Sequence, residues 1–145
     1  MKIKNLVDNT TSFLLKRLSE LIGLALLCLS ILLLASLVSY SPEDPNFIFP
    51  ENTEIKNLLG AKGSYASDIL FQSIGLISLL VPISFFLISL SVIIDKKILH
   101  IIESLFFTIL YSITGALFFT VFHTETYWLT LNGNNGFLGN LFEET

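Results

Sequence analysis

His100 and Glu103 are the ionisable residues placed deepest in apolar sequence, so they are the first candidates for chemistry. They stand three residues apart in the run that begins at Ile98, which puts them on one face of a helix. Ionisable groups at membrane depth are costly and often mark proton or ion pathways. Both residues lie within about two helical turns of Lys96, close enough to reach water or pair with a lysine. We expect a structural, interfacial role rather than a proton relay.

The other reactive residue types form no recognisable site. Cys28 is the single cysteine and lies inside an apolar run, so we expect a small buried hydrophobe. Lys62 stands between Gly60 and Gly63, but the GxxxxGK[ST] phosphate-binding pattern is absent from this stretch. No metal-ligand spacing occurs, and no Ser-His-Asp or Cys-His set falls on one side of a membrane. We predict no catalytic residue, no metal, no cofactor and no direct contact with ATP.

The composition is that of a membrane protein. Of 145 residues, 52% are hydrophobic and only 14% are charged, against roughly 25% charged residues in soluble domains. The formal net charge of −4 provides no basic surface, so nothing favours direct contact with nucleic acid. Membrane lipid is the expected surrounding of most of this chain.

Three uncharged runs are long enough to cross a hydrocarbon core about 30 Å thick. They predict an all-α membrane protein with three transmembrane helices and an ordered outer loop between the first two. A cleaved signal peptide is disfavoured, because the first apolar run exceeds the usual length and no small-residue cleavage site follows it. Pro82 is expected to kink the second helix. The predicted segments are a leader (1–17), a helix (18–40), a periplasmic loop (41–66), a helix (67–94), a cytoplasmic turn (95–97), a helix (98–122) and a periplasmic tail (123–145).

Lysine and arginine set the predicted orientation. The leader carries four of these residues, the short turn carries Lys96 and Lys97, and the tail carries none. Because cytoplasmic segments are enriched in such residues, the amino terminus and the turn are expected in the cytoplasm. Tyr40, Tyr127 and Trp128 would then share the outer interface as an aromatic belt.

Small residues recur every four positions in the third helix, at Ser104, Thr108, Ser112 and Ala116. Such a stripe lets helix backbones approach closely. The spacing is equally compatible with packing inside one chain and with packing between subunits.

The polar stretch between the first two helices has distinct ends. Pro42 and Pro45 stop the first helix and turn the chain. At the other end, Ser64, Ser67 or Asp68 is expected to accept hydrogen bonds from the free amides of the next helix, and Asp68 to interact with its dipole.

The same stretch carries a spaced pattern that reaches into the second helix. Its positions are Ser41, Pro42, Asp44, Pro45, Asn57, Gly60, Gly63, Asp68 and Gly75. The pattern resembles the amino-terminal membrane region of the FtsK/SpoIIIE family of DNA translocases. Ser64 and Ser67 depart from it, since alanine is more usual at both positions, but the change in size is small. The tail is also similar to the third loop of the family, through Gly136-Phe137-Leu138-Gly139.

This resemblance implies a multi-pass anchor in the bacterial inner membrane that tethers a hexameric DNA pump at the division septum. The family has four membrane helices and an ATP-driven motor, so the chain is expected to end before the fourth helix and the motor. The partners would be further copies and division-septum proteins, with the nine pattern residues as contact candidates. The alternative is an autonomous three-helix accessory subunit of a transporter or respiratory complex, in which His100 or Glu103 would be functional.

Overall fold

The structure, a computed structural model, describes residues 2–46, 54–96, 98–122, 129 and 133–143. Its helices are α1 (Lys2–Val38), α2 (Gly60–Ile74), α3 (Leu80–Asp95), α4 (Leu99–Phe122) and α5 (Gly136–Glu143), and the 3-10 helix η1 (Gly75–Leu79) joins α2 to α3. Three stretches are long and apolar enough to cross a membrane: Asn9–Val38, Gly60–Asp95 and Leu99–Phe122. The predicted all-α class with three membrane-spanning helices is confirmed.

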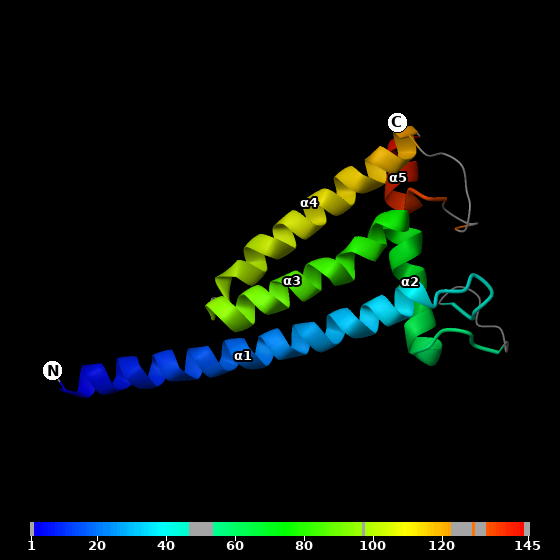
Figure 1. The fold of residues 1–145 in the computed structure, drawn as a ribbon. Helices are drawn as coiled ribbons and strands as arrows, with labels where there is room; N and C mark the ends of the chain where they lie inside the picture. Colours follow the sequence, from blue (N-terminus) through cyan, green and yellow to red (C-terminus); the bar gives the residue numbers. More distant parts are fainter. Residues whose placement is uncertain (1, 47–53, 97, 123–128, 130–132, 144–145) are drawn as a thin grey trace.

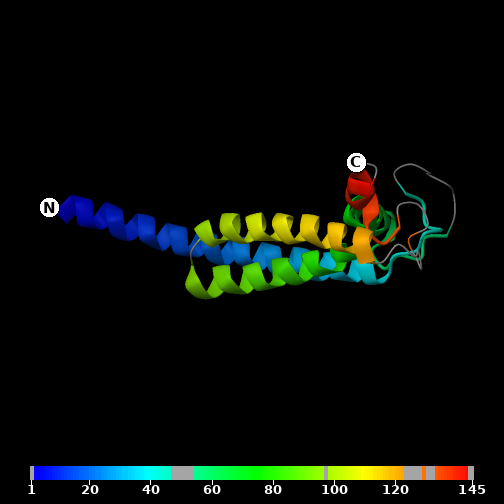
Figure 2. The same cartoon turned by 90° about the horizontal axis from the view of Figure 1, so that it is seen from above.

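The long helices α1, α3 and α4 form an elongated bundle, and α2 crosses one end of it (Figure 1). Helix α1 packs along α3, and α4 packs against α3 and η1, whereas α1 and α4 make no contact with each other among the described residues. Helix α5 lies beside α2 and α4 at the end that α2 crosses. The amino-terminal part of α1 extends beyond the opposite end (Figure 2).

The predicted second helix, 67–94, is interrupted. Helix α2 begins at Gly60, seven residues before the predicted start, and ends at Ile74. Gly75 has a φ of +65°, a backbone conformation that glycine adopts without steric cost. The chain turns there into η1 and α3 (Figure 1). Since η1 and α3 together rise about 34 Å, they cross a hydrocarbon core without help from α2.

The kink predicted at Pro82 is wrong. Pro82 lies in the first turn of α3, a part of a helix in which proline is tolerated, and α3 continues from there to Asp95. The change of direction occurs at Gly75 instead, because that backbone leaves the right-handed helical region.

Small residues bring α1 and α3 close together. A Cβ atom added at Gly23 would lie 2.6 Å from Ile93 Cγ1 and 3.3 Å from the Ser89 carbonyl oxygen. Further toward the carboxyl end of α1, in the same interface, Ser30 Oγ donates a hydrogen bond of 2.9 Å to the Pro82 carbonyl. Close approach and an interhelical hydrogen bond are the main attractions between helices in lipid, where apolar burial contributes little.

The small-residue stripe on α4 packs inside the chain. Thr108, Ser112 and Ala116 are the buried residues of α4. Thr108 Oγ1 and Ser112 Oγ each donate to the carbonyl four residues earlier, at 2.8 Å and 2.7 Å, so their hydroxyls are satisfied without leaving the helix. Of the two alternatives left open by the spacing, the structure shows packing within one chain.

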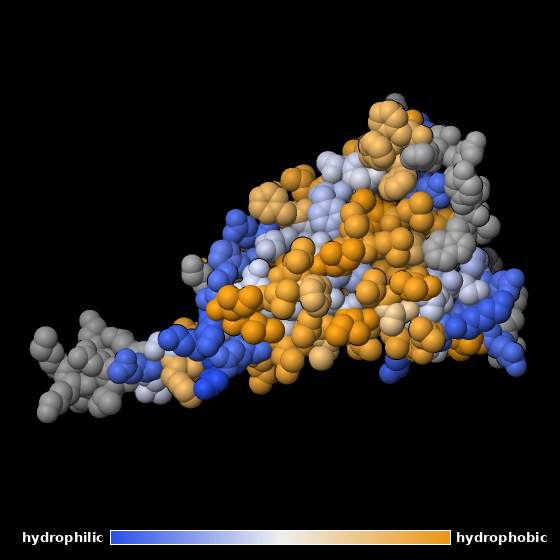
Figure 3. Space-filling view, in the orientation of Figure 1, coloured by the Kyte–Doolittle hydropathy of each residue, from blue (hydrophilic) through white to orange (hydrophobic). Residues whose placement is uncertain are grey.

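Apolar side chains cover the face that α1, α3 and α4 present in Figure 3, and polar ones gather toward the two ends of the bundle. A large exposed apolar surface marks a membrane or partner contact. Because the apolar helices are long enough to cross a hydrocarbon core about 30 Å thick, a membrane contact is the better explanation of this surface.

We predict that Gly23→Val weakens the contact between α1 and α3. The added side chain meets Ile93 and the Ser89 carbonyl, and overpacking of this kind costs about 1–3 kcal/mol of unfolding free energy. Unfolding followed by circular dichroism in detergent measures the loss. The control is Leu24→Val, because Leu24 is exposed on the same helix; equal destabilisation by both variants would contradict this packing.

Candidate functional site

Buried polar side chains gather where the segment after α1 meets α2. Asp44, Asn57 and Asp68 expose only 4%, 5% and 5% of their surface. Such side chains are seldom buried unless their polar atoms find partners. Their partners come from the end of α1, from the residues that follow it and from the segment before α2. We call Ser36, Ser39, Tyr40, Asp44, Asn57 and Asp68 together the loop anchor.

Asp44 closes the loop. The turn at Ser41 and Pro42 brings the Asp44 N–H within 3.2 Å of the Ser41 carbonyl. The Asp44 carboxylate then accepts hydrogen bonds from two consecutive backbone amides, Lys56 at 2.9 Å and Asn57 at 2.8 Å. Hydrogen bonds to a charged acceptor are stronger than neutral ones. One side chain therefore holds the two ends of a loop together across twelve residues of sequence.

Asn57 connects the end of α1 to the beginning of α2. Its Nδ2 donates to the Ser36 carbonyl at 2.9 Å and to the Ser39 carbonyl at 3.4 Å. The Ser36 carbonyl belongs to the last turn of α1, where a helix has acceptors without intrahelical partners, and Ser39 follows the helix directly. Asn57 Oδ1 accepts from the Leu59 N–H at 3.1 Å, and Ser39 Oγ accepts from the Leu58 N–H at 3.0 Å. Side chains thus bind both the backbone at the end of α1 and the backbone directly before α2.

Asp68 lies within α2 and not at its start, so its predicted role at the helix terminus is wrong. The Tyr40 hydroxyl donates to Asp68 Oδ1 at 3.3 Å, and Gln72 Nε2 donates to the same oxygen at 3.4 Å. Burial, followed by the nearby Asp68 charge, raises the pKa of Tyr40, which keeps the hydroxyl protonated as a donor.

Tyr40 was expected in an aromatic belt at the outer interface, and the structure shows its side chain packed inside the chain. It is 8% exposed, and its ring packs against Phe71 with a centroid distance of 4.8 Å. Leu37 and Leu129 complete this small apolar core. The other expected belt residues, Tyr127 and Trp128, lie outside the described residues.

Two pattern glycines allow the close contacts of this site. A Cβ atom at Gly63 would overlap the Asn57 side chain, and Ser36 Oγ donates to the Gly63 carbonyl at 2.6 Å. Gly60 begins α2 with a φ of +64°, and its N–H donates to the Asn57 carbonyl at 2.9 Å.

Pro45 and Ser64 fix the loop against α2. Pro45 is buried, and its carbonyl accepts a hydrogen bond of 2.8 Å from Ser64 Oγ. Ser64 is one of the two positions that depart from the family pattern, and its hydroxyl adds a contact that alanine could not make.

Gly75 brings the tail against the junction of α2 and η1. A Cβ atom at Gly75 would overlap the Asn134 carbonyl, and that carbonyl accepts a hydrogen bond of 2.9 Å from the Leu76 N–H. Asn135 Nδ2 donates to Thr120 Oγ1 of α4 at 3.2 Å and to Asn140 Oδ1 of α5 at 2.8 Å. The residues before α5 therefore join α2 to α4.

The ionisable residues of the opposite end form a second, exposed group. Glu20 pairs with Lys96 at 2.8 Å and with Arg17 at 2.6 Å, linking α1 to the turn after α3. His100 Nδ1 lies 3.5 Å from Glu103 Oε2, with the two side chains 41% and 65% exposed. The loop anchor and this group are therefore at different ends of the bundle.

Cys28 was expected to be buried, and this prediction is wrong. Its side chain is exposed on α1. An apolar run does not reveal which of its residues face other helices and which face lipid.

Six of the nine pattern residues are buried: Asp44, Pro45, Asn57, Gly63, Asp68 and Gly75. Ser41 and Gly60 are half-buried, and Pro42 is exposed. Sequence reasoning missed Ser36 and Ser39 as part of this site, because neither belongs to the spaced pattern. Their position at the end of an apolar helix, Ser36 in its last turn and Ser39 directly after it, was the available signal.

Comparisons with known proteins identify similar sequences. The family model described as the 4TM region of DNA translocase FtsK/SpoIIIE matches residues 15–145. A DNA translocase FtsK of Agrobacterium fabrum is 26% identical over 131 residues, covering 90% of this chain and 15% of that protein. The DNA translocase FtsK of Rickettsia bellii is 41% identical over 54 residues, covering 37% of this chain and 7% of its own length.

A third relative, the DNA translocase FtsK of Azospirillum brasilense, is 37% identical over 68 residues, covering 46% of this chain and 11% of that protein. The chain thus spans less than a sixth of the length of these curated relatives. No solved structure matches it significantly.

We predict that Asp44→Ala opens the loop. Both amides that its carboxylate accepts become buried donors without a partner, so the free energy of unfolding should fall by about 2–3 kcal/mol. Hydrogen exchange of a peptide covering 54–59 should become faster, while exchange in α3 stays unchanged. The control is Glu43→Ala, because Glu43 is the neighbouring acidic residue, its side chain is exposed and it pairs with the exposed Lys56. Unchanged exchange at 54–59 in Asp44→Ala would contradict the role given to Asp44.

Proposed function

The chain belongs to the FtsK/SpoIIIE family of DNA translocases through its 4TM region, and we propose that it anchors such a translocase in the membrane at the division septum. The resemblance read from the loop pattern is confirmed at the level of the family. The chain is a multi-pass membrane segment, and the matched region is the membrane domain and not the ATPase motor. In this proposal the rest of the whole protein hydrolyses ATP and moves DNA during chromosome segregation.

The observation that carries the proposal is the extent of the match. It runs from residue 15 to residue 145 and therefore includes the three-helix bundle, the loop anchor and α5. The bundle supplies the apolar surface that an anchor in the bacterial inner membrane requires.

We further propose that the end carrying Arg17 and Lys96 faces the cytoplasm. Glu20 pairs with both residues, so the basic residues of the leader and of the turn come together at one end of the bundle. Lysine and arginine favour the cytoplasmic side. The opposite end, with the loop anchor, α2 and α5, would then face the periplasm.

The proposed contact with division proteins uses the surface that the loop anchor supports. Most pattern residues are buried, so they would position the loop without touching a partner. Leu58 is 76% exposed and Ile55 is 40% exposed, and both lie beside Asn57 in the sequence. Exposed apolar side chains on a rigid loop are typical of contact sites. Self-association would use the lipid-facing sides of α1 and α4.

We predict that Leu58→Asp in the complete translocase reduces septal recruitment without loss of membrane insertion. The charge is placed on an exposed side chain, so the fold should tolerate it while an apolar contact is lost. Fluorescence of a tagged translocase at the septum, divided by total membrane fluorescence, measures the effect, and a several-fold decrease is expected.

The matched control is Leu99→Asp, since Leu99 is 79% exposed at the opposite end of the bundle. An aspartate in the first turn of α4 also agrees with the helix dipole. Unchanged septal fluorescence in Leu58→Asp, or an equal loss in Leu99→Asp, would contradict the proposed contact.

A further inference from the structure

A groove of about 380 Å³ runs between α1 and α2 at the end of the bundle that carries the loop anchor. Its α1 side is lined by Leu29, Leu32, Leu33 and Ser36, and its α2 side by Leu59, Lys62, Gly63 and Ala66. The volume lies within the range of about 300–1,000 Å³ found for small-molecule sites. The walls are apolar apart from one hydroxyl and one ammonium group.

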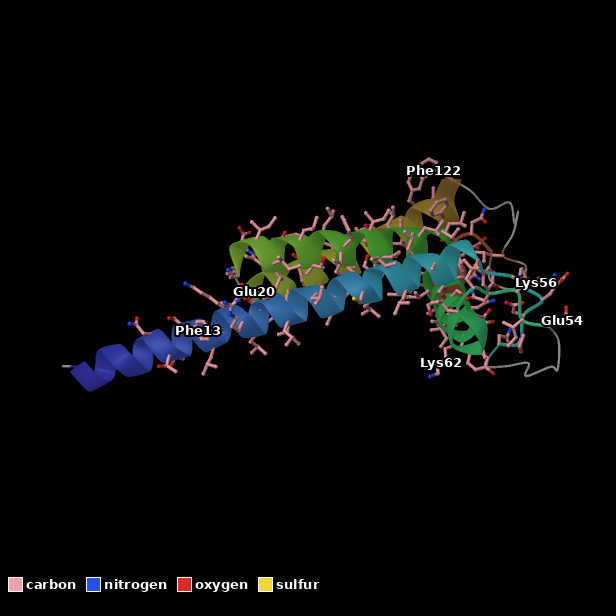
Figure 4. The ribbon with its side chains drawn as sticks, turned by 60° about the horizontal axis from the view of Figure 1, so that its bottom comes forward. Phe13, Glu20, Glu54, Lys56, Lys62 and Phe122 are labelled. Atoms are coloured by element: carbon pink, nitrogen blue, oxygen red, sulfur yellow. The ribbon has the colours of Figure 1, made fainter. Side chains whose placement is uncertain are left out.

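These two polar groups differ in their partners. Ser36 Oγ donates to the Gly63 carbonyl at 2.6 Å, so it needs nothing from an occupant. Among the described residues, no carboxylate lies within salt-bridge distance of Lys62. Figure 4 shows Lys62 projecting from α2 on a different side from Lys56 and Glu54. The groove therefore has one cation that is available to an anionic occupant.

Two other grooves in the bundle carry a lysine or an arginine, and each of these two cations pairs with Glu20. The groove beside Leu15 contains Lys96 and His100, which face Glu20 and Glu103 respectively. The groove along the amino-terminal part of α1 contains Arg17, which pairs with Glu20. Of these three, the groove between α1 and α2 combines apolar walls with an uncompensated positive charge.

The depth of its residues fits a lipid. Leu29, Leu32 and Leu33 lie in the last three turns of α1, which ends at Val38, so they reach the level of acyl chains. Lys62 lies in the first turn of α2, which crosses the end of the bundle (Figure 1) at the level of head groups. The positive end of the α2 dipole adds to the attraction for an anion at this place.

We propose that this groove binds an anionic phospholipid, with an acyl chain against Leu29, Leu32 and Leu33 and the phosphate beside the Lys62 ammonium. In this proposal the apolar walls bind the acyl chain, and the Lys62 charge makes an anionic head group bind more tightly than a zwitterionic one. The site is independent of any role in division, because it uses only α1, α2 and the surrounding lipid.

The test is native mass spectrometry of the chain purified in detergent with an equimolar mixture of phosphatidylglycerol and phosphatidylcholine. The wild-type chain should retain phosphatidylglycerol preferentially. Lys62→Gln should reduce this preference about fivefold, which corresponds to one lysine near an anionic lipid surface. Lys62→Arg should keep most of it, since the charge remains.

Two further variants separate the site from general effects. Lys56→Gln should keep the wild-type preference, because Lys56 is exposed and pairs with Glu43. Ala66→Trp should lower retention of both lipids, because it fills the groove while leaving Lys62 in place.

Unchanged preference in Lys62→Gln, or an equal loss in Lys56→Gln, would overturn the proposal. A change of oligomeric state in Ala66→Trp with lipid retention intact would also overturn it, by indicating a second copy as the occupant. Circular dichroism of each variant confirms that the helices remain folded.

Discussion

The hydrogen bonds of the Asn57 side chain at the end of α1 are the interaction on which the rest of this structure depends. The end of a helix has carbonyl groups without intrahelical partners. Here the Asn57 amide donates to the Ser36 carbonyl in the last turn of α1 and to the Ser39 carbonyl directly after that helix. The same side chain accepts a hydrogen bond at the beginning of α2. Asp44 then holds the Asn57 backbone in place. This short polar network sets the position of α2 across the bundle.

The position of α2 explains why the family pattern is so spread out in sequence. Its aspartates, asparagine and glycines meet at one end of the bundle, where each either satisfies a backbone group or permits a close approach. Gly75 likewise permits a close approach of the tail, because the Asn134 carbonyl lies against it and accepts a hydrogen bond from the Leu76 N–H. The hydrogen-bonded end of the bundle that results suits both the proposed contact through Leu58 and the proposed lipid groove beside Lys62.

The three spanning helices could be predicted from sequence because a bilayer demands continuous apolar length, and hydropathy measures that length directly. The break at Gly75 could not, since the residues on both sides of it are apolar and Pro82 is the more obvious helix breaker. Asp68 was assigned to a helix start because serines and an aspartate before an apolar run are typical of one; its partner Tyr40 is 28 residues away in sequence. The pattern of Asp44, Asn57 and Gly63 identified the site, but only three-dimensional contacts reveal that these residues are buried.

The most direct test of this account is a depth measurement by nitroxide spin labels, in a Cys28→Ser background, at Ala61, Ala66, Ile69 and Ser73 of α2 and at Ile83, Leu87 and Ile94 of α3. Accessibility to oxygen and to a water-soluble nickel complex reports the depth of each label in a bilayer. If α2 crosses the end of the bundle, its labels stay near head-group depth with no trend along the helix, and the α3 labels pass through the bilayer centre. A depth that increases steadily from Ala66 to Leu87 would contradict the account, because it would require one continuous membrane span through Gly75.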